Sequence, residues 1–195
     1  MYTQIKSYMI QMAPLNKNEI HWLETFFEPD ELSKGTYLLE VGQVCKYIFF
    51  INKGLVRHGH IDEKGQEITC DFTCENEFLT DYLSFNQQQP SEYFFKAMEE
   101  VRLLKIERAN LQKLYALSTT FEQIGRKVAE KIAVRVTAMA QSLITDKAET
   151  RFLYLLQSSP TIFQRVPYKY IASYLGMKPE TLSRIRKKIQ QREKS

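Results

Sequence analysis

Four polar side chains near the C-terminus recur at the spacing of one face of a helix. Glu180, Ser183, Arg184 and Lys187 occupy positions i, i+3, i+4 and i+7, so a helix would hold them on its outer side. A glutamate can accept a hydrogen bond from cytosine N4, and an arginine can fork onto guanine O6 and N7. We therefore predict that Glu180, Ser183 and Arg184 read base edges in duplex DNA.

Basic and hydroxyl side chains near this face suit phosphate oxygens, which position a protein on DNA without reporting its sequence. A surface helix with a solvated basic face is the structural alternative, and an isolated amphipathic helix would favour it. The residues expected to contact phosphates are Lys169, Lys178, Thr181, Lys187 and Lys188, with Arg186, Arg192 and Lys194 adding positive charge nearby.

The elements that must position these side chains form a predicted helix-turn-helix over residues 168–187. Gly176 stands where the turn between the helices needs a positive φ, which costs energy for any residue with a Cβ. Pro179 stands where the second helix would begin, and the first turn of a helix has no N–H bond there to lose. Because these spacings are met together, they favour DNA binding over the solvated-helix alternative. The predicted inward-facing residues are Ile171, Ala172, Leu175, Leu182, Ile185 and Ile189.

The run IASYLGMKPETLSRIRKKIQ resembles the C-terminal helix-turn-helix of the Crp/Fnr family of bacterial transcription regulators. Glu180, Ser183 and Arg184 are similar to the base-reading set of the Fnr branch, and this resemblance implies a TTGA-type half-site. Lys178 departs from the family, because a serine or threonine cap is expected at its position. The resemblance further implies a homodimer on an inverted repeat in double-stranded DNA, and a contact with RNA polymerase.

Composition and charge agree with a sensor joined to a nucleic-acid reader. The 195 residues are 44 % hydrophobic and 26 % charged, as in ordinary globular proteins. Residues 146–195 hold 11 Lys/Arg and 4 Asp/Glu, whereas residues 1–145 hold 16 and 19, so the basic excess is confined to the C-terminal segment. No secretory signal and no apolar run of about 20 residues is recognisable. With three cysteines expected as reduced thiols, we predict a cytoplasmic protein with no membrane partner.

Residues 31–106 follow the two-residue period of β-strands, interrupted by glycines. This spacing predicts an antiparallel sandwich or barrel, with a hairpin turn at residues 63–66. The expected strands are 36–40, 47–52, 55–62, 67–72, 93–98 and 102–106. The segment also resembles the cyclic-nucleotide-binding jelly roll of the Crp/Fnr family, through Gly35, Gly42, Ile51, Gly54, Val56, Arg57, Gly65 and Glu67.

Helices are predicted on both sides of the strands, so the fold class is α+β. Residues 1–13 are expected to be a loosely packed lead-in, and 15–27 a helix with Asn16 and Glu19 as its capping box. The predicted architecture is an N-terminal antiparallel β jelly roll with flanking helices, a long dimerisation helix and a C-terminal helix-turn-helix domain. The domain boundaries follow as a sensor at 1–118, the long helix and hinge at 119–145, and the DNA-binding domain at 146–195.

The long helix should run over about residues 120–142, a length of ~33 Å, with a capping box at Thr119 and Glu122. A helix buried within its own chain is the structural alternative. In the family that the chain resembles, this helix pairs with its twin, which favours a homodimer. The predicted dimer seam consists of Ile124, Val128, Ile132, Val136, Met139 and Leu143.

The sensor lacks a feature that the resemblance would require for cyclic nucleotides. Family members that bind them carry Gly-Glu at the start of a short helix and, further on, an arginine followed by Ser/Thr and Ala. Here the corresponding positions are interpreted as Asn76-Glu77 and Ser91-Glu92. Because a phosphate without its arginine and beside Glu92 would cost several kcal/mol, we expect no binding of cAMP or cGMP. The effector is then an unknown small molecule or none.

Other chemistry in the strand segment is sparse. His58 and His60 could be two metal ligands, but two polar residues on a solvated strand face are the simpler interpretation. Neither a metal nor a cofactor is therefore predicted, nor an enzyme, since a jelly-roll metalloenzyme needs three or four ligands. The alternative function is a jelly-roll module that binds a small molecule or a protein and carries a degenerate DNA-binding domain. The cysteines are Cys45, Cys70 and Cys74.

Overall fold

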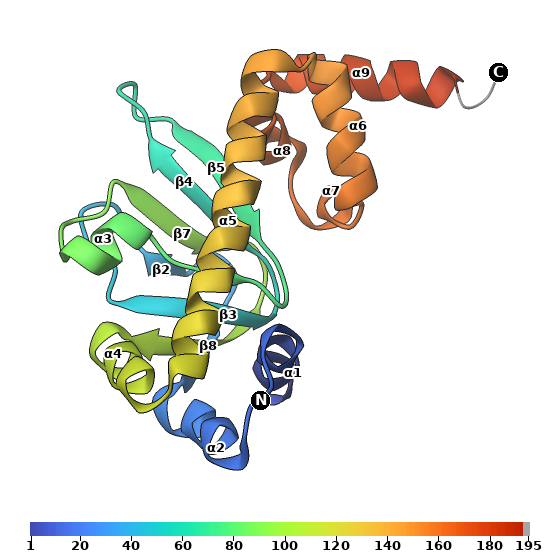
Figure 1. Ribbon diagram of the computed structural model, residues 1–195. Helices are drawn as coiled ribbons and strands as arrows, with labels where there is room; N and C mark the ends of the chain where they lie inside the picture. The colour runs from blue at the N-terminus through green and yellow to red at the C-terminus, as the bar shows by residue number, and fades with distance from the viewer. Residues whose placement is uncertain (193–195) are drawn as a thin grey trace.

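The strands form two antiparallel four-stranded sheets that lie face to face as a β-roll, in a computed structural model that describes residues 1–192 (Figure 1). One sheet has the order β1-β8-β3-β6 and the other β2-β7-β4-β5. Lys194, expected to add positive charge, lies outside the described residues. The strands are β1 (Glu28–Leu32), β2 (Tyr37–Leu39), β3 (Tyr47–Lys53), β4 (Val56–Ile61), β5 (Glu67–Thr73), β6 (Phe78–Leu79), β7 (Tyr93–Ala97) and β8 (Val101–Glu107).

The six strands expected from the alternating pattern are present, and two further strands were not predicted. Strand β1 contains Pro29 and pairs only with β8, so it is an edge strand, where a residue without an N–H is tolerated. Strand β6 has two residues, too few for a periodic pattern, and pairs with β3. The predicted hairpin turn joins β4 to β5, with Gly65 at φ 76° and the Asp62 carboxylate accepting from the amides of Lys64 and Gln66.

The prediction of a loose N-terminal lead-in was wrong. Residues Thr3–Met12 form helix α1, and Ile5 and Met9, one turn apart, are buried in the core below the roll. The Tyr2 hydroxyl donates to the carbonyl of Phe27 at 2.8 Å. Two buried residues in a ten-residue helix are a weak sequence signal, and packing against distant strands is what stabilises so short a helix.

Two predicted helix boundaries depend on capping side chains. Helix α2 (Lys17–Phe26) has the expected capping box, in which Asn16 and Glu19 bond to each other's backbone amides. The long helix α5 (Thr119–Thr145) is capped one residue earlier than predicted, because the Ser118 hydroxyl accepts from the amide of Thr120. The same hydroxyl donates to Glu19, which ties α5 to α2. The remaining sensor helices are α3 (Tyr82–Gln87), which was not predicted, and α4 (Arg108–Leu117).

Beyond α5 the chain forms a compact helical unit, here called the reader, which begins after the expected hinge at Asp146 and Lys147. Figure 1 shows the reader beside the upper part of α5, close to the ends of β4 and β5. No helix of the described chain combines the length and apolarity that a bilayer crossing needs. The reader helices are α6 (Ala148–Ser158), α7 (Ile162–Arg165), α8 (Tyr168–Tyr174) and α9 (Pro179–Arg192).

The reader shares its hydrophobic core with the β-roll. Leu55, Phe72 and Met98 of the β-roll are buried in the same cluster as the inward-facing residues of α6, α8 and α9. The aromatic rings of Phe72 and Tyr174 lie 5.4 Å apart across this junction. The sensor and the reader are therefore joined by apolar packing as well as by the chain connection.

Candidate nucleic-acid interface

The helix-turn-helix predicted from the sequence is formed by α8 and α9. Gly176 has φ 64° in the turn, and the amide of Met177 bonds to the carbonyl of Ala172 at 3.0 Å, which closes the end of α8. A Cβ on Gly176 would lie 3.0 Å from the Leu143 side chain, so the turn also packs against α5. The predicted core is confirmed: Ile171, Ala172, Leu175 and Leu182 are buried, and Ile185 and Ile189 are packed against them.

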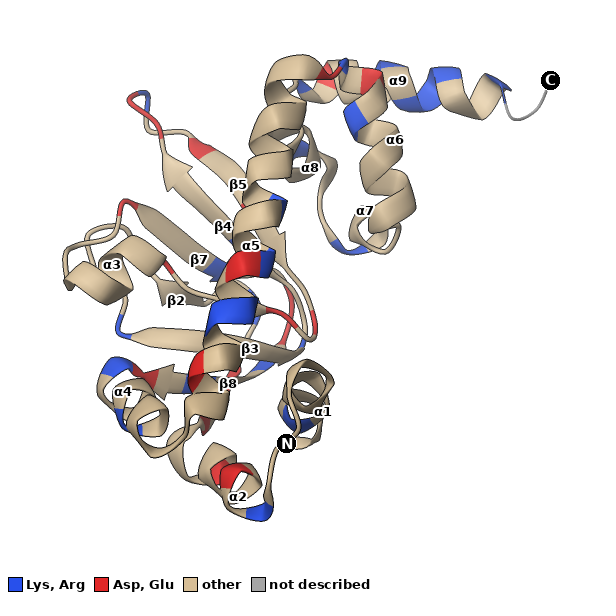
Figure 2. Cartoon of the chain, viewed as in Figure 1, with Lys and Arg blue, Asp and Glu red and all other residues tan. Residues whose placement is uncertain are grey.

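Helix α9 exposes the residues predicted to read bases. Glu180, Ser183 and Arg184 are all solvent-exposed, as is Lys187 on the next turn. The guanidinium of Arg184 lies 3.5 Å from the Thr181 hydroxyl, a long contact that leaves its fork available. Figure 2 shows the blue of Lys and Arg along α9, in contrast to the mixed charges of the β-roll. The arrangement offers a carboxylate acceptor and a guanidinium donor on one exposed helix face, which suits base-edge recognition.

The four lysines predicted to contact phosphates divide into two groups. Lys169, Lys178 and Lys187 are exposed, and the ammonium of Lys169 lies 4.7 Å from the Tyr170 ring on the same helix. Lys188 instead forms an ion pair with Glu149 of α6 at 2.8 Å, a carboxylate that also pairs with Arg192. A phosphate contact by Lys188 would have to break this pair, so its side of α9 faces α6.

The pairing of Lys188 could not be expected from the sequence, because Glu149 lies 39 positions earlier. Its hydrogen bond with Lys188, followed by the charges of Lys188 and Arg192, lowers the pKa of Glu149 although desolvation raises it. The pair helps to hold α9 against α6. Lys188 is therefore better described as a residue that supports the helix than as a free cation.

The long helix α5 changes role along its length. Ile124 is 2 % exposed and Val128 packs against the same intrachain core, so the start of the predicted seam lies inside the protomer. Further along, Val136 is 54 % exposed and Leu143 is 42 % exposed. Ile132 and Met139 are half-buried. The structural alternative of an intrachain helix therefore holds for the first turns, while the later turns present apolar side chains to solvent.

The sequence pattern did not identify two exposed apolar residues of α5. Val134 is 71 % exposed and Ile144 is 85 % exposed, and neither belongs to the predicted seam. The ion pair between Arg135 and Asp71 of β5 holds the middle of the helix to the roll at 2.8 Å. Arg135 therefore points towards the roll, and the apolar periodicity alone did not distinguish the inner face of α5 from the outer face.

The structure corrects the position assigned to the first half of the phosphate cassette. Asn76 and Glu77 lie in the turn between β5 and β6, where Asn76 has φ 63° and the Glu77 carboxylate accepts from the amide of Cys74. The short helix α3 begins later and is capped by Asp81. The residues at the start of the short helix are thus Thr80 and Asp81.

The second half of the cassette lies next to that helix start. The Ser91 hydroxyl donates to Asp81 at 2.6 Å, and it also accepts from the amide of Tyr93 at 3.0 Å. Ser91 and Asp81 are buried, whereas Glu92 is exposed. The Ser91 hydroxyl and the Asp81 carboxylate are therefore bonded to each other, and neither is the cation that a phosphate-binding site would need. A shallow hollow of about 620 Å³ beside them is lined by Gly42, His60, Ser91 and Glu92, among others.

The two histidines of the β4 strand pack against an aromatic ring. The His58 and His60 rings contact Tyr93, at 4.8 and 6.4 Å between centroids. Burial lowers the pKa of His58 to about 4, and its Nε2 has no hydrogen-bond partner. No group of three or more His, Cys, Asp or Glu within residues 1–192 could hold a metal ion.

All three cysteines are free thiols. Burial, followed by the charge of Glu77, raises the pKa of Cys74 to about 11. Burial likewise raises the pKa of Cys70, with a further contribution from Asp71. Both thiols are therefore protonated near neutral pH and are poor nucleophiles.

Comparison with known proteins identifies the sensor and the overall fold. Residues 29–118 match the model of the cyclic nucleotide-binding domain family. No curated protein sequence matches the chain significantly. Among solved structures, the c-di-GMP-responsive global regulator CLP of Xanthomonas campestris superposes with a TM-score of 0.71 at 18 % identity, covering 91 % of this chain and 93 % of CLP.

Two further solved structures cover most of the chain. The catabolite activator protein of Thermus thermophilus has a TM-score of 0.59 at 17 % identity, with 95 % of this chain and 88 % of the other covered. A transcriptional regulator of the Crp/Fnr family from Eubacterium rectale has a TM-score of 0.69 at 16 % identity, over the same shares of the two chains. Residues 29–118 thus match the cyclic nucleotide-binding domain family, and the chain as a whole has a fold similar to that of a Crp/Fnr transcription regulator.

Proposed function

We propose that this protein is a sequence-specific DNA-binding transcription regulator of the Crp/Fnr type. The observation that carries the proposal is the exposed set Glu180, Ser183 and Arg184 on α9, a helix whose opposite side is anchored by the buried Leu182. A carboxylate and a guanidinium on one face can discriminate bases in the major groove, while Lys169, Lys178 and Lys187 supply salt-dependent affinity. The similar solved regulators support the regulatory class.

The proposed active form is a homodimer that binds an inverted repeat with TTGA-like half-sites. Two readers related by a two-fold axis would place their α9 helices in successive major grooves, about 34 Å apart. The exposed apolar part of α5, including Val136 and Leu143, supports pairing along that helix. In this role the protein would act in the cytoplasm, with RNA polymerase as a further partner.

The proposed regulator is not controlled by cAMP or cGMP. Ser91 and Asp81 bond to each other at the place where a bound cyclic phosphate would need an arginine. Leaving a phosphate charge uncompensated beside a buried carboxylate would cost several kcal/mol. CLP responds to c-di-GMP, and the effector here is proposed to be another small molecule or none.

Selection of genomic DNA fragments with purified, ligand-free protein tests the proposed function. The expected result is recovery of an inverted repeat with TTGA-like half-sites, whose binding weakens steeply as the salt concentration rises. The Arg184→Ala variant is the control, because it removes a base contact and leaves the phosphate contacts in place. Recovery of fragments without any common motif, with wild type and variant alike, would contradict the proposal and favour a binding module with a degenerate reader.

A further inference from the structure

Arg57 is buried at the junction between the β-roll and the reader. Its side chain is 0 % exposed, although it carries a charge. The guanidinium carbon lies 4.8 Å from the centre of the Phe94 ring on β7 and 3.9 Å from that of the Tyr170 ring on α8. The guanidinium also pairs with the Glu67 carboxylate of β5. We call these four residues, Arg57, Glu67, Phe94 and Tyr170, the Arg57 clasp.

The sheet is shaped to admit this stack. Gly59 on β4 lies opposite Phe94 on β7. A Cβ on Gly59 would be 2.6 Å from the Phe94 ring and 2.3 Å from the carbonyl oxygen of Ile68. Any side chain at position 59 would therefore displace the Phe94 ring or the backbone at Ile68. A buried cation held between two rings and one carboxylate is a directional contact, because a tilt of α8 would remove Tyr170 from it.

Other contacts around the clasp fix the same orientation. The amide of Thr69 on β5 donates to the Ser173 hydroxyl on α8 at 2.9 Å. At the far side of the reader, Arg165 pairs with Glu75 at 2.7 Å and also with Glu99, both from the β-roll. The reader is thus held to the roll at separate points, through polar groups of specific geometry as well as through apolar packing.

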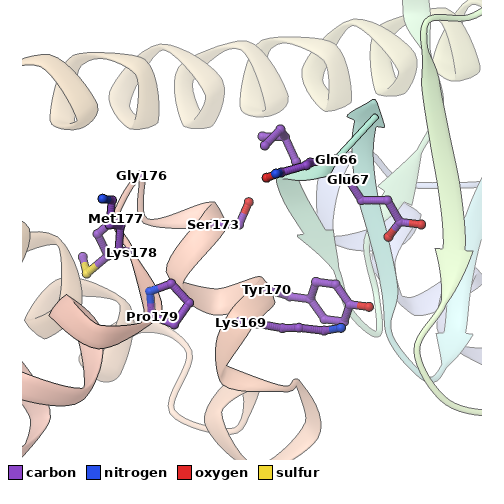
Figure 3. A pocket seen from close by; sticks show the side chains of 10 residues that line it. Gln66, Glu67, Lys169, Tyr170, Ser173, Gly176, Met177, Lys178 and Pro179 are labelled. Carbon is purple, nitrogen blue, oxygen red and sulfur yellow. The ribbon is translucent and has the colours of Figure 1, made fainter. Parts of the chain in front are cut away.

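The clasp also borders two of the lysines predicted to contact phosphate. A cleft of about 800 Å³ lies between β5 and the helix-turn-helix, lined by Glu67, Tyr170, Lys169 and Lys178 among others (Figure 3). Burial raises the pKa of Glu67, but the hydrogen bond and the charge of Arg57 outweigh this, so the pKa is lowered and the pair is neutral overall. The Glu67 carboxylate is therefore paired with Arg57, and in the part of the chain that the structure describes no salt bridge joins it to Lys169 or Lys178, which line the same cleft.

We propose that the Arg57 clasp is the positioning element of the DNA reader, and that it sets the separation of the two α9 helices without a bound effector. The inference rests on the proposed function, since it assumes that two readers bind one inverted repeat. Docking to the roll fixes each reader relative to its own α5, because Arg135 and Asp71 also hold α5 to the roll. If α5 forms the dimer axis, one separation of half-sites is favoured. The clasp thereby replaces the ordering that an effector would otherwise provide.

The test compares binding to a panel of inverted repeats whose half-sites are separated in steps of one base pair, and to a single half-site. The wild-type dimer should prefer one separation. Tyr170→Ala should lower affinity for the preferred repeat by about tenfold or more and broaden the separation profile. Its affinity for a single half-site should be unchanged, because Tyr170 is not a predicted DNA contact. Tyr170→Phe retains the ring and should restore the wild-type profile.

A second variant tests the clasp through Arg57, independently of Tyr170. Arg57→Met removes the buried cation at similar volume, and Arg102→Met is its matched control, because Arg102 forms an exposed pair with Glu31 far from the reader. Arg57→Met should broaden the profile as Tyr170→Ala does, and Arg102→Met should not. Loss of half-site binding by Arg57→Met, together with an altered circular dichroism spectrum, would mean that this variant misfolds. In that case the separation profile of Tyr170→Ala alone tests the proposal.

The outcomes separate this inference from the proposed function. A wild-type protein without preference for any sequence would overturn both. A wild type that prefers one repeat, with a Tyr170→Ala variant of identical profile, would overturn only the positioning role. A Tyr170→Ala variant that binds the repeat more tightly than wild type would also overturn it, because the clasp would then hold the reader in an inactive orientation.

Discussion

The Ser91 hydroxyl donates to the Asp81 carboxylate at 2.6 Å, inside the β-roll at the start of helix α3. Asp81 at the same time caps α3 by accepting from the amides of Leu83 and Ser84. The carboxylate is therefore committed to the protein's own groups, and neither it nor the serine can neutralise an anion. Both side chains are thus engaged in hydrogen bonds within the protein.

The first prediction is that cAMP and cGMP do not bind with micromolar affinity. An uncompensated phosphate beside Asp81 would lose the arginine fork that makes such sites strong. Isothermal titration calorimetry of the purified protein should show no saturable heat for either nucleotide at 100 µM, a concentration on the order of ordinary ligand-binding constants. A micromolar isotherm for either nucleotide would refute the prediction.

The second prediction separates base reading from phosphate contact. Arg184→Ala should cost about 1–3 kcal/mol on the preferred site and relax preference at one base pair. Lys187→Ala should weaken binding to all sequences about equally and reduce the salt slope by about one. Fluorescence anisotropy with a set of single-base variants, at several salt concentrations, measures both effects. The division of roles would be wrong if both variants lowered affinity for every sequence alike.

Lys188→Ala provides the matched control for Lys187→Ala. The ammonium of Lys188 is held by Glu149 at 2.8 Å, so its removal should change the salt slope less than the removal of Lys187. An equal change in slope would mean that the ion pair opens on DNA and that Lys188 contacts phosphate, as the sequence pattern first indicated.

The third prediction concerns the dimer. Val136 is 54 % exposed, so Val136→Glu should leave the protomer folded but place a charge in the predicted seam and dissociate the dimer. Sedimentation velocity would detect the monomer, and circular dichroism would confirm the fold. Val134 lies two residues away, on nearly the opposite and more exposed side of α5, so Val134→Glu should leave the dimer intact. Dissociation by Val134→Glu and not by Val136→Glu would move the seam to that other face.

The fourth prediction is a pH dependence of stability from His58. Burial lowers the pKa of this imidazole to about 4, against the opposing effect of Asp81. The unfolded chain protonates His58 near its ordinary pKa of about 6.5. Stability from the neutral imidazole is thus fully present above pH ~6.5 and is lost as the pH falls towards 4, by on the order of 3 kcal/mol. His58→Gln should remove this loss in urea unfolding between pH 4 and 7.

Asp71 titrates with the opposite sign in the same range. Burial raises its pKa to about 6, while Arg135 opposes the shift. The stability that the protonated Asp71 contributes is fully present below the unfolded pKa of about 3.9, and it is lost as the pH rises through 6. The wild type should therefore show a shallower pH dependence than His58→Gln, whose stability should increase on acidification towards pH 4. A His58→Gln curve parallel to that of wild type would contradict the assignment.

The sequence determined the elements whose signals are local. The helix-turn-helix follows from apolar residues at helical spacing, from Gly176 in the turn and from Pro179 at the start of α9. All of these signals lie close together in the sequence. The strands between Tyr37 and Glu107, except the two-residue β6, follow from a two-residue period interrupted by glycines. These patterns reflect backbone preference and burial of one face, which neighbouring residues largely determine.

The tertiary structure decided what depends on contacts between distant segments. Helix α1 is held by packing onto strands far along the chain, Lys188 is bound by Glu149, and Ile124 turns inward while Val136 turns outward. Helix α3 begins at Tyr82, after the Asp81 cap and not at residues 76–77, and Asp81 also accepts a hydrogen bond from Ser91, ten positions along the chain. The Arg57 clasp joins β4, β5, β7 and α8. No periodic pattern marks such contacts, because their partners are brought together only when the sheets and the reader pack.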